Sequence, residues 1–298
     1  MMIDQYKAQA EAWFRTLRDN ICTAFEAIEV EQHSNSNSTE QQADTFTRTR
    51  WDRPEGGGGD MSLMRGAIFE KVGVNISTVH GEFSEKFRKE IPGAEEDPRF
   101  WASGISLVAH MRNPHVPAIH MNTRFIVVGD GGIDAKGHAS DDVSGRWWFG
   151  GGADLNPMFE DEALANAFHA TYQACCDRHD PEYYARFSAW CDEYFFIKHR
   201  NEARGAGGIF YDYVNTGTWA QDMAFTRDVG ETFLAHYPTV VRERLSHPWT
   251  QEDRAHQLYK RGRYAEFNLV YDRGTRFGLM TNGNPEAILM SLPPVATW

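Results

Sequence analysis

Residues 105–128 read ISLVAHMRNPHVPAIHMNTRFIVV, and this stretch decides the fold. Apolar and polar side chains alternate over 105–110 and again over 120–128, which is the period of a strand with one buried face. Between them, Pro114 and Pro117 make the link a stiff loop, because proline cannot donate to a strand ladder. The pattern predicts two strands that an antiparallel hairpin would bring side by side.

One face of that hairpin would gather polar side chains. Ser106 and His110 share a face of the first strand, and His120, Asn122 and Arg124 share a face of the second. These groups suit a ligand that bears carboxylates, since arginine can hold a carboxylate through two hydrogen bonds. The alternative is a face washed by solvent, but such faces usually carry Lys and Glu. We therefore expect a functional face.

Composition restricts the class of partner. The chain has 298 residues, 41% of them hydrophobic, and a formal net charge of −12 at pH 7. This charge argues against nucleic-acid binding, and it lets an anionic ligand bind only where arginines gather. No apolar run is long enough to span a bilayer, and the N-terminus lacks the pattern of a secretory signal. Four cysteines without a CxxC pair predict reduced thiols and a cytoplasmic protein.

Strand patterns occur in consecutive groups, with helical patterns between the groups. This order favours an α+β fold, in which a large, mainly antiparallel sheet is flanked by helices in a single domain over residues 1–298. A polar segment at about 31–46 is expected to be a mobile loop. The expected helices are 1–30, 161–178, 182–200, 219–245 and 285–291, and the further expected strands are 147–149 and 264–271.

Two glycine-rich segments stand out. In WWFGGGADLNP (147–157), three glycines after three aromatic residues allow the backbone to approach another group closely. Asp154 follows where we expect the chain to leave the strand, and taken alone it is better explained as a capping residue of a turn. The segment EGGGGD (55–60) is a flexible connector or a close-approach backbone, and it is weak evidence for a phosphate loop because no GK[ST] follows.

The C-terminal part offers two more candidates. The strand predicted at 264–271 is followed by Asp272 and Arg273, which alternation places on opposite faces unless the strand ends there. Asn284 precedes Pro285, the pattern of a helix N-cap with proline at the first helical position. A helix N-terminus can bind an anion, but an ordinary capped helix also explains this segment well.

Four histidines could converge on a metal ion: His110, His120, His169 and His199. No HExxH or comparable local pair requires such a site. Lone histidines are more often hydrogen-bonded structural residues, and we favour that interpretation.

These segments together resemble the oxygen-dependent coproporphyrinogen III oxidase family, in kind and in order. The resemblance rests on SLVAHMRNPHVPAIHMNTRF (106–125), WWFGGGADLNP, FFIKHRNEARGAGGIFYD (195–212) and GRYAEFNLVYDRGTRFGL (262–279), with EGGGGD and VNISTVHGE (74–82) nearer the front. It implies that two propionate groups of coproporphyrinogen III become vinyl groups. O2 would be the electron acceptor, protoporphyrinogen IX, CO2 and H2O2 the products, and no organic cofactor is expected.

By motif position, the resemblance also implies roles for individual residues. The implied substrate contacts are Ser106, Asn122, Thr123, Arg124, Arg273, Asn282, Gly283 and Asn284. The implied catalytic residues are His120, Asp154, Asp272 and Arg124. The implied ligands of a divalent metal are His110, His120, His169 and His199. His120 would be a proton donor and Arg124 would hold the reacting propionate. An aspartate would accept pyrrole protons, and the choice between Asp154 and Asp272 stays open.

Two features bear on the rim of the site and on assembly. Many family members carry an arginine where this chain has Asn282-Gly283-Asn284, so one rim cation is missing here. The helix N-terminus that follows could replace part of that charge. Members of the family are typically homodimers, which the resemblance implies for this chain too.

Two other classes of function stay open on the residues alone. One is a histidine-based metalloenzyme with a different reaction, which requires stoichiometric metal and loss of activity to chelators. The other is a module that binds a tetrapyrrole or polycarboxylate without catalysis. An aerobic assay for the conversion of coproporphyrinogen III separates these classes.

Overall fold

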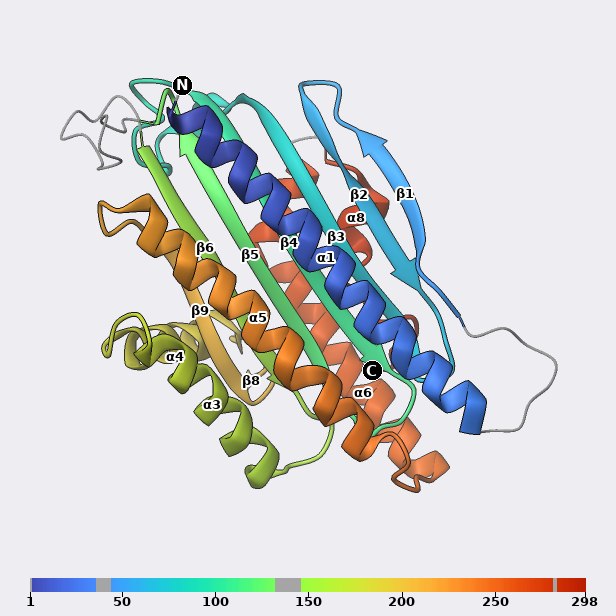
Figure 1. The fold of residues 1–298 in the computed structure, drawn as a ribbon. Coiled ribbons are helices and arrows are strands. Elements are labelled where there is room, and N and C mark those ends of the chain that lie inside the picture. The colour runs from blue at the N-terminus through green and yellow to red at the C-terminus, as the bar shows by residue number, and fades with distance from the viewer. Residues whose placement is uncertain (1, 36–43, 132–145, 281–282) are drawn as a thin grey trace.

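An antiparallel sheet of seven strands forms the centre of the computed structural model, which describes residues 2–35, 44–131, 146–280 and 283–298 (Figure 1). Its strand order is β1-β2-β3-β4-β5-β6-β9, so consecutive strands are neighbours until β9 joins beyond β6. The strands are β1 (Thr47–Asp52), β2 (Gly57–Met64), β3 (Phe69–Glu82), β4 (Arg99–Met111), β5 (Ala118–Val128), β6 (Arg146–Asn156) and β9 (Gly207–Val214). The short strands β7 (Phe196–Ile197) and β8 (Glu202–Ala203) form a separate hairpin.

Helices cover both faces of this sheet. In Figure 1, α1 (Met2–Asn35) and α5 (Trp219–Arg244) cross in front of the sheet, and α6 (Gln251–Val270) lies behind it. The other helices are α2 (Glu85–Arg88), α3 (Glu162–Asp177), α4 (Tyr183–Tyr194), α7 (Arg273–Met280) and α8 (Pro285–Leu289). This arrangement confirms the predicted α+β class with a large antiparallel sheet.

The main core lies between the sheet and the pair α1 and α5. Leu107, Met121 and Phe125 point to this side from β4 and β5, and each is fully buried. Phe14 of α1 and Phe233 of α5 belong to the same buried cluster. Because burial of one such side chain contributes about 1.5–3 kcal/mol, this face fixes the register of the sheet.

The opposite face carries Ser106, His120, Asn122 and Arg124, which strand alternation had placed on one face of the hairpin. The predicted hairpin is confirmed: β4 and β5 pair antiparallel, with Ser106 opposite Asn122. A transverse row runs across five strands through Gly59, Ser77, Gly104, Arg124 and Gly150. Arg124 has the only long side chain in this row, so a floor of backbone and small side chains surrounds one guanidinium.

The prediction of a strand at 264–271 is wrong, because these residues belong to α6 and its C-terminal cap. Helix α6 begins well upstream, where Thr250 and Asp253 form a capping box. Tyr264, Phe267 and Asn268 are buried at spacings of three and four residues, which places them on one helical face. A short run rich in aromatic and aliphatic residues fits both periods, so alternation alone misled the prediction.

Several predicted boundaries also change. Strand β6 continues from the predicted 147–149 through the glycines, so Asp154 lies within a strand and not at its exit. A Cβ at Gly152 would lie 2.4 Å from the carbonyl oxygen of Ile209, which explains why glycine is needed beside β9. The helix predicted at 182–200 ends at Tyr194, and β7 and β8 follow.

The N-terminal helix is longer than predicted. It runs to Asn35, so the prediction of a mobile loop at about 31–46 is wrong for residues 31–35, which are helical. Residues 36–43 of that segment lie outside the described residues. The predicted helices at 1–30, 161–178, 219–245 and 285–291 are confirmed as α1, α3, α5 and α8.

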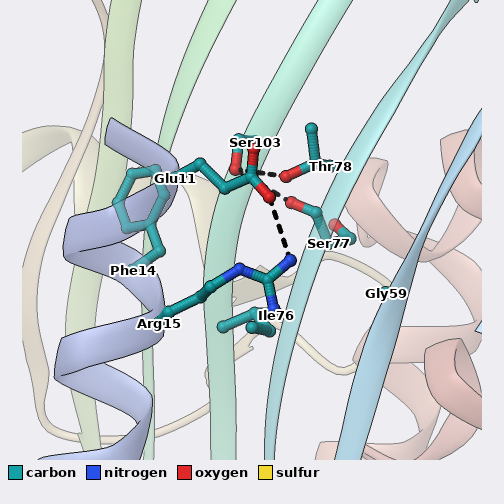
Figure 2. A pocket seen from close by; sticks show the side chains of 8 residues that line it. All are labelled: Glu11, Phe14, Arg15, Gly59, Ile76, Ser77, Thr78 and Ser103. Atoms are coloured by element: carbon teal, nitrogen blue, oxygen red, sulfur yellow. Dashed lines mark hydrogen bonds and ion pairs between the residues drawn. The ribbon is translucent and has the colours of Figure 1, made fainter. Parts of the chain in front are cut away.

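Two hollows bounded by described residues lie away from the polar face. One is a pocket of about 10 Å³ between α1 and the sheet, where Glu11 and Arg15 face Thr78, Ser103 and the backbone of Ser77 (Figure 2). It has room for about one water molecule. The other is an open groove of about 430 Å³ between α1 and α5, lined largely by small side chains such as Ala24 and Ala27. Neither touches the candidate site residues.

Among the described helices, none has the length and apolar character needed to cross a membrane.

Candidate active site

Three polar side chains of β5 form a hydrogen-bonded ladder along the strand. His120, Asn122 and Arg124 project from alternate positions and therefore share a face. The Nδ2 of Asn122 lies 3.1 Å from Nε2 of His120, and Nη1 of Arg124 donates to Oδ1 of Asn122 at 3.2 Å. Each side chain of the ladder thus orients the next.

A buried carboxylate anchors one end of the ladder. His120 Nδ1 lies 2.8 Å from Oδ1 of Asp154, and the other carboxylate oxygen accepts hydrogen bonds from Arg204 and Asn156. Asp154 is only 2% exposed. Burial alone would raise the pKa of Asp154, but the positive charge of Arg204 and the hydrogen bond from His120 lower it to about 2. Asp154 is therefore a fixed anion at neutral pH.

This arrangement sets the tautomer of His120. Because Asp154 can only accept, Nδ1 of His120 carries the proton that it donates. Nε2 is then the acceptor for the amide of Asn122, and it is also the atom that can gain or release a proton. The geometry therefore allows His120 to move a proton at Nε2.

A second carboxylate holds the other end of the ladder. Nη2 of Arg124 lies 2.8 Å from Oδ2 of Asp212 on β9, and Trp148 Nε1 donates to Oδ1 of Asp212 at 3.1 Å. About 30% of the Arg124 side chain is exposed. Burial lowers the pKa of the Arg124 guanidinium, but Asp212 outweighs this effect and raises it. Arg124 is therefore a permanent cation that still faces solvent.

Asp272 and Arg273 lie at the start of helix α7, not at the end of a strand. Asp272 caps this helix, since its Oδ2 accepts from the backbone N–H of Thr275 at 2.6 Å. Its Oδ1 accepts from the Tyr194 hydroxyl at 2.9 Å. The guanidinium carbon of Arg273 lies 5.4 Å from the ring centroid of Tyr194. The predicted placement on opposite faces of a strand therefore does not apply.

Both arginines act on one neighbouring phenol. Burial raises the pKa of the Tyr213 hydroxyl, and Asp212 adds to this, whereas the charges of Arg124 and Arg273 lower it. Arg124 on the sheet and Arg273 on α7 thus lie within electrostatic range of the same side chain.

The remaining predicted substrate contacts are only partly brought together. Ser106 is exposed on the polar face, opposite Asn122. Thr123 points to the other face and is fully buried, so its side chain does not reach this site.

Asn284 caps α8, accepting from the N–H groups of Glu286 and Ala287 at 2.9 and 3.2 Å, which confirms the predicted cap. Gly283 donates its N–H to Gly278. Asn282 lies outside the described residues.

The four candidate metal ligands lie in separate hydrogen-bond networks. His110 is buried beneath the end of α8, with Nε2 2.9 Å from the carbonyl oxygen of Ser291, and burial together with the charge of Arg261 lowers its pKa to about 3. The ring of His169 bonds to Tyr184 and to the carbonyl of Ala206, and that of His199 bonds to Tyr271 and Glu266. In the part of the chain that is described, no three His, Cys, Asp or Glu side chains are placed to hold a metal ion.

Sequence reasoning missed three members of the network: Arg204, Asn156 and Asp212. Only 2% of the Arg204 side chain is exposed, which is rare for an arginine unless it is paired. Its guanidinium carbon lies 3.9 Å from the ring centroid of Phe195 and 4.8 Å from that of Phe267. No local pattern pairs Arg204 with Asp154, because the two residues are 50 positions apart in the chain.

Family membership follows once this geometry is compared with known proteins. Residues 9–298 match the model of the family described as coproporphyrinogen III oxidase, and the chain belongs to this family. It is 53% identical over 287 residues to the protein of Rickettsia bellii named oxygen-dependent coproporphyrinogen-III oxidase, covering 96% of each chain. It is 54% identical over 282 residues to the protein of that name from Rickettsia akari, covering 95% of this chain and 94% of the relative.

Proposed function

We propose that this protein is an oxygen-dependent coproporphyrinogen III oxidase of haem biosynthesis. It converts two propionate groups of coproporphyrinogen III to vinyl groups and yields protoporphyrinogen IX. Each step consumes one O2, which takes up two electrons and two protons to become H2O2 while the propionate carboxyl leaves as CO2. The relatives named for this activity match nearly the whole chain in length.

The observation that carries the proposal is the cationic ladder on a floor of small residues. The substrate is a flat macrocycle with four carboxylates at its rim. Beside Arg124, the row presents backbone and small side chains at Gly104 and Ser77 to such a face. The indole of Trp51 lies over Gly59 at the far end of the row. We propose that Arg124 and Arg273 bind propionates, assisted by Ser106 and Asn122.

The roles of the aspartates differ in this proposal. Asp154 is buried and bonded to His120, Arg204 and Asn156, so it orients His120 and does not itself touch substrate. Asp272 is partly exposed at the start of α7. We therefore propose Asp272 as the acceptor of pyrrole protons and His120 as the proton donor. Loss of a pyrrole proton makes the electron-rich macrocycle reactive toward O2, and no organic cofactor is needed.

The divalent metal stays a prediction of the sequence. The ring nitrogens of His120, His169 and His199 are already engaged within the chain, and the four histidines do not gather in one group of described side chains. These residues as arranged do not fit a shared metal ion, and we assign no step to one.

Assembly and location are proposed on separate grounds. Large apolar side chains are exposed near the C-terminal helices, among them Leu269, Val270, Met280 and Trp298. Such a surface suits burial against a second copy, and we propose a homodimer. All four cysteines are buried free thiols, which fits the reducing cytoplasm. A single domain over residues 1–298 remains our proposal for the domain organisation.

The test is an aerobic assay with purified protein and coproporphyrinogen III. After turnover, the tetrapyrroles are oxidised and the protoporphyrin fluorescence is measured, with an anaerobic reaction as the control. We expect product only with O2. Product that forms equally without O2, or no product at all, contradicts the proposal. Treatment with a chelator distinguishes this reaction from that of a histidine-based metalloenzyme. The proposed reaction needs no metal held by the four histidines, so we expect activity to survive the chelator.

A further inference from the structure

Strand β9 carries a bulge at the edge of the candidate site. Phe149 pairs with Val214 and Gly151 pairs with Tyr211, so Gly150 on β6 faces two residues of β9, Asp212 and Tyr213. Such a two-against-one arrangement bends the strand and redirects a side chain. Ile209 and Tyr211 point into the main core, so alternation along β9 puts Asp212 on the face that bears Arg124, and the bulge adds Tyr213 beside it opposite Gly150.

The backbone at this bulge is strained. Tyr213 has φ +55°, in the left-handed region that a residue with a Cβ rarely adopts. Conformations of this kind are unfavourable and persist only where the surroundings hold them in place. At Tyr213 those surroundings include the Asp212 carboxylate, which accepts the backbone N–H of Tyr213 at 3.1 Å.

Asp212 is held by contacts on both carboxylate oxygens. Oδ1 accepts from Trp148 and from the Tyr213 backbone, and Oδ2 lies 2.8 Å from Nη2 of Arg124. The Asp212 side chain is about 15% exposed, so solvent screens this ion pair only in part. A carboxylate held in this way fixes the plane of the guanidinium that it contacts.

Gly150 supplies the space for this pair. A Cβ at position 150 would lie 2.6 Å from Oδ1 of Asp212 and 2.8 Å from Nε of Arg124. Those distances are too short for real contacts, so any larger residue would push the pair apart. The glycine opposite the bulge, the bulge and the ion pair therefore form one local arrangement.

We propose that Asp212 is a positioning residue, which orients the guanidinium of Arg124 to receive the reacting propionate of the substrate. This inference rests on the proposed function of the site. A guanidinium has five N–H donors, and the bonds to Asp212 and Asn122 use two of them. The remaining donors then point in a fixed direction, so that a propionate meets an arginine that is already oriented. Orientation of this kind affects the chemical step more than the initial binding.

The test begins with Asp212→Asn, which keeps the size of the side chain and removes its charge. We expect kcat to fall about 10- to 100-fold, with KM changed less than about threefold. The matched control is Asp228→Asn, because Asp228 also holds an arginine, Arg178, at 2.8 Å. This control pair joins α3 and α5, away from the proposed site, and its loss should leave kcat unchanged.

A double-mutant cycle with Arg124→Lys separates positioning from a merely structural role. If Asp212 acts through Arg124, Asp212→Asn should cost less than about twofold in kcat when it is added to the Arg124→Lys variant. Equal losses in both backgrounds, or a kcat within twofold of wild type for Asp212→Asn, would overturn the proposal. If Asp212→Asn does not fold, Gly150→Ala gives a second route, and it too should reduce kcat only where Arg124 is present.

Failure of the proposed reaction gives a different result. If the wild-type protein makes no product, the proposed reaction is wrong. The double-mutant cycle is then carried out with the affinity for coproporphyrin III, measured by fluorescence quenching, in place of kcat. Nonadditive losses of affinity at Asp212 and Arg124 would still support positioning. Additive losses, or no loss at Asp212, would reject it independently of the reaction.

Discussion

At the scale of single residues, the site is organised by two carboxylates that pin a ladder of three side chains. Asp154 fixes His120 and Asp212 fixes Arg124, while Asn122 links the two. Strand alternation correctly placed His120, Asn122 and Arg124 on one face. It could not identify Asp212, because β9 was not among the predicted strands. It could not identify Arg204 either, because its aromatic neighbour Phe267 belongs to a helix that was predicted as a strand.

The buried pair of Asp154 and Arg204 makes a strong prediction for stability. Both side chains are about 2–3% exposed, so Asp154→Asn leaves a buried guanidinium without its counter-charge. We expect the free energy of unfolding to fall by about 3–5 kcal/mol. Chemical denaturation measures this change. The exposed pair of Arg242 and Glu31 provides the control, since Glu31→Gln should cost less than about 1 kcal/mol. Equal losses in the two variants would contradict the account.

At the scale of elements, α6 matters because it leads directly to Asp272 and Arg273. Glu70 on β3 fastens this helix to the sheet, accepting from Arg254 and from Arg261 of α6. Burial raises the pKa of Glu70, but the two arginines outweigh it and lower the pKa. The sequence did not reveal this link, because Arg254 and Arg261 lie in a stretch for which no helix was predicted, far from Glu70 in the chain.

Glu70→Gln should therefore destabilise the protein in a pH-dependent way. A lowered pKa in the folded state gives stability that is present above the unfolded pKa of about 4.3 and is lost as the pH falls through the folded value. We expect a loss of about 3–5 kcal/mol at pH 7 and a smaller difference from wild type below about pH 4. Thermal unfolding across pH checks this. A difference that stays constant with pH would show that Glu70 acts through packing alone.

At the scale of the whole molecule, one face of the sheet packs on the main core and the other face bears the candidate active site. Periodicity predicted the α+β class and the central hairpin, because burial of one face forces strict alternation. It failed at 264–271, where a short apolar run fits two periods, and it ended β6 too early, because glycines usually weaken a strand. The site could be located from motifs, but its ion pairs depend on long-range packing that local patterns do not encode.

The exposed apolar side chains near the C-terminus lead to a prediction about assembly. Val270 is 52% exposed beside Leu269, so a charge at this position should weaken a contact between two copies. We expect wild type to behave as a dimer in light scattering, and Val270→Asp to shift it toward the monomer without loss of secondary structure. A wild-type monomer, or a variant that stays fully dimeric, would contradict a dimer through this surface.

The central claim is oxidative decarboxylation at the face that bears Arg124. The most direct test follows O2 consumed and CO2 released from coproporphyrinogen III that is labelled in its propionate carboxyls. We expect one CO2 for each O2. Turnover should fall about 100-fold or more in Arg124→Ala. It should stay unchanged in Arg178→Ala, because Arg178 lies in a surface ion pair. CO2 released without O2 uptake, or full activity in Arg124→Ala, would contradict it.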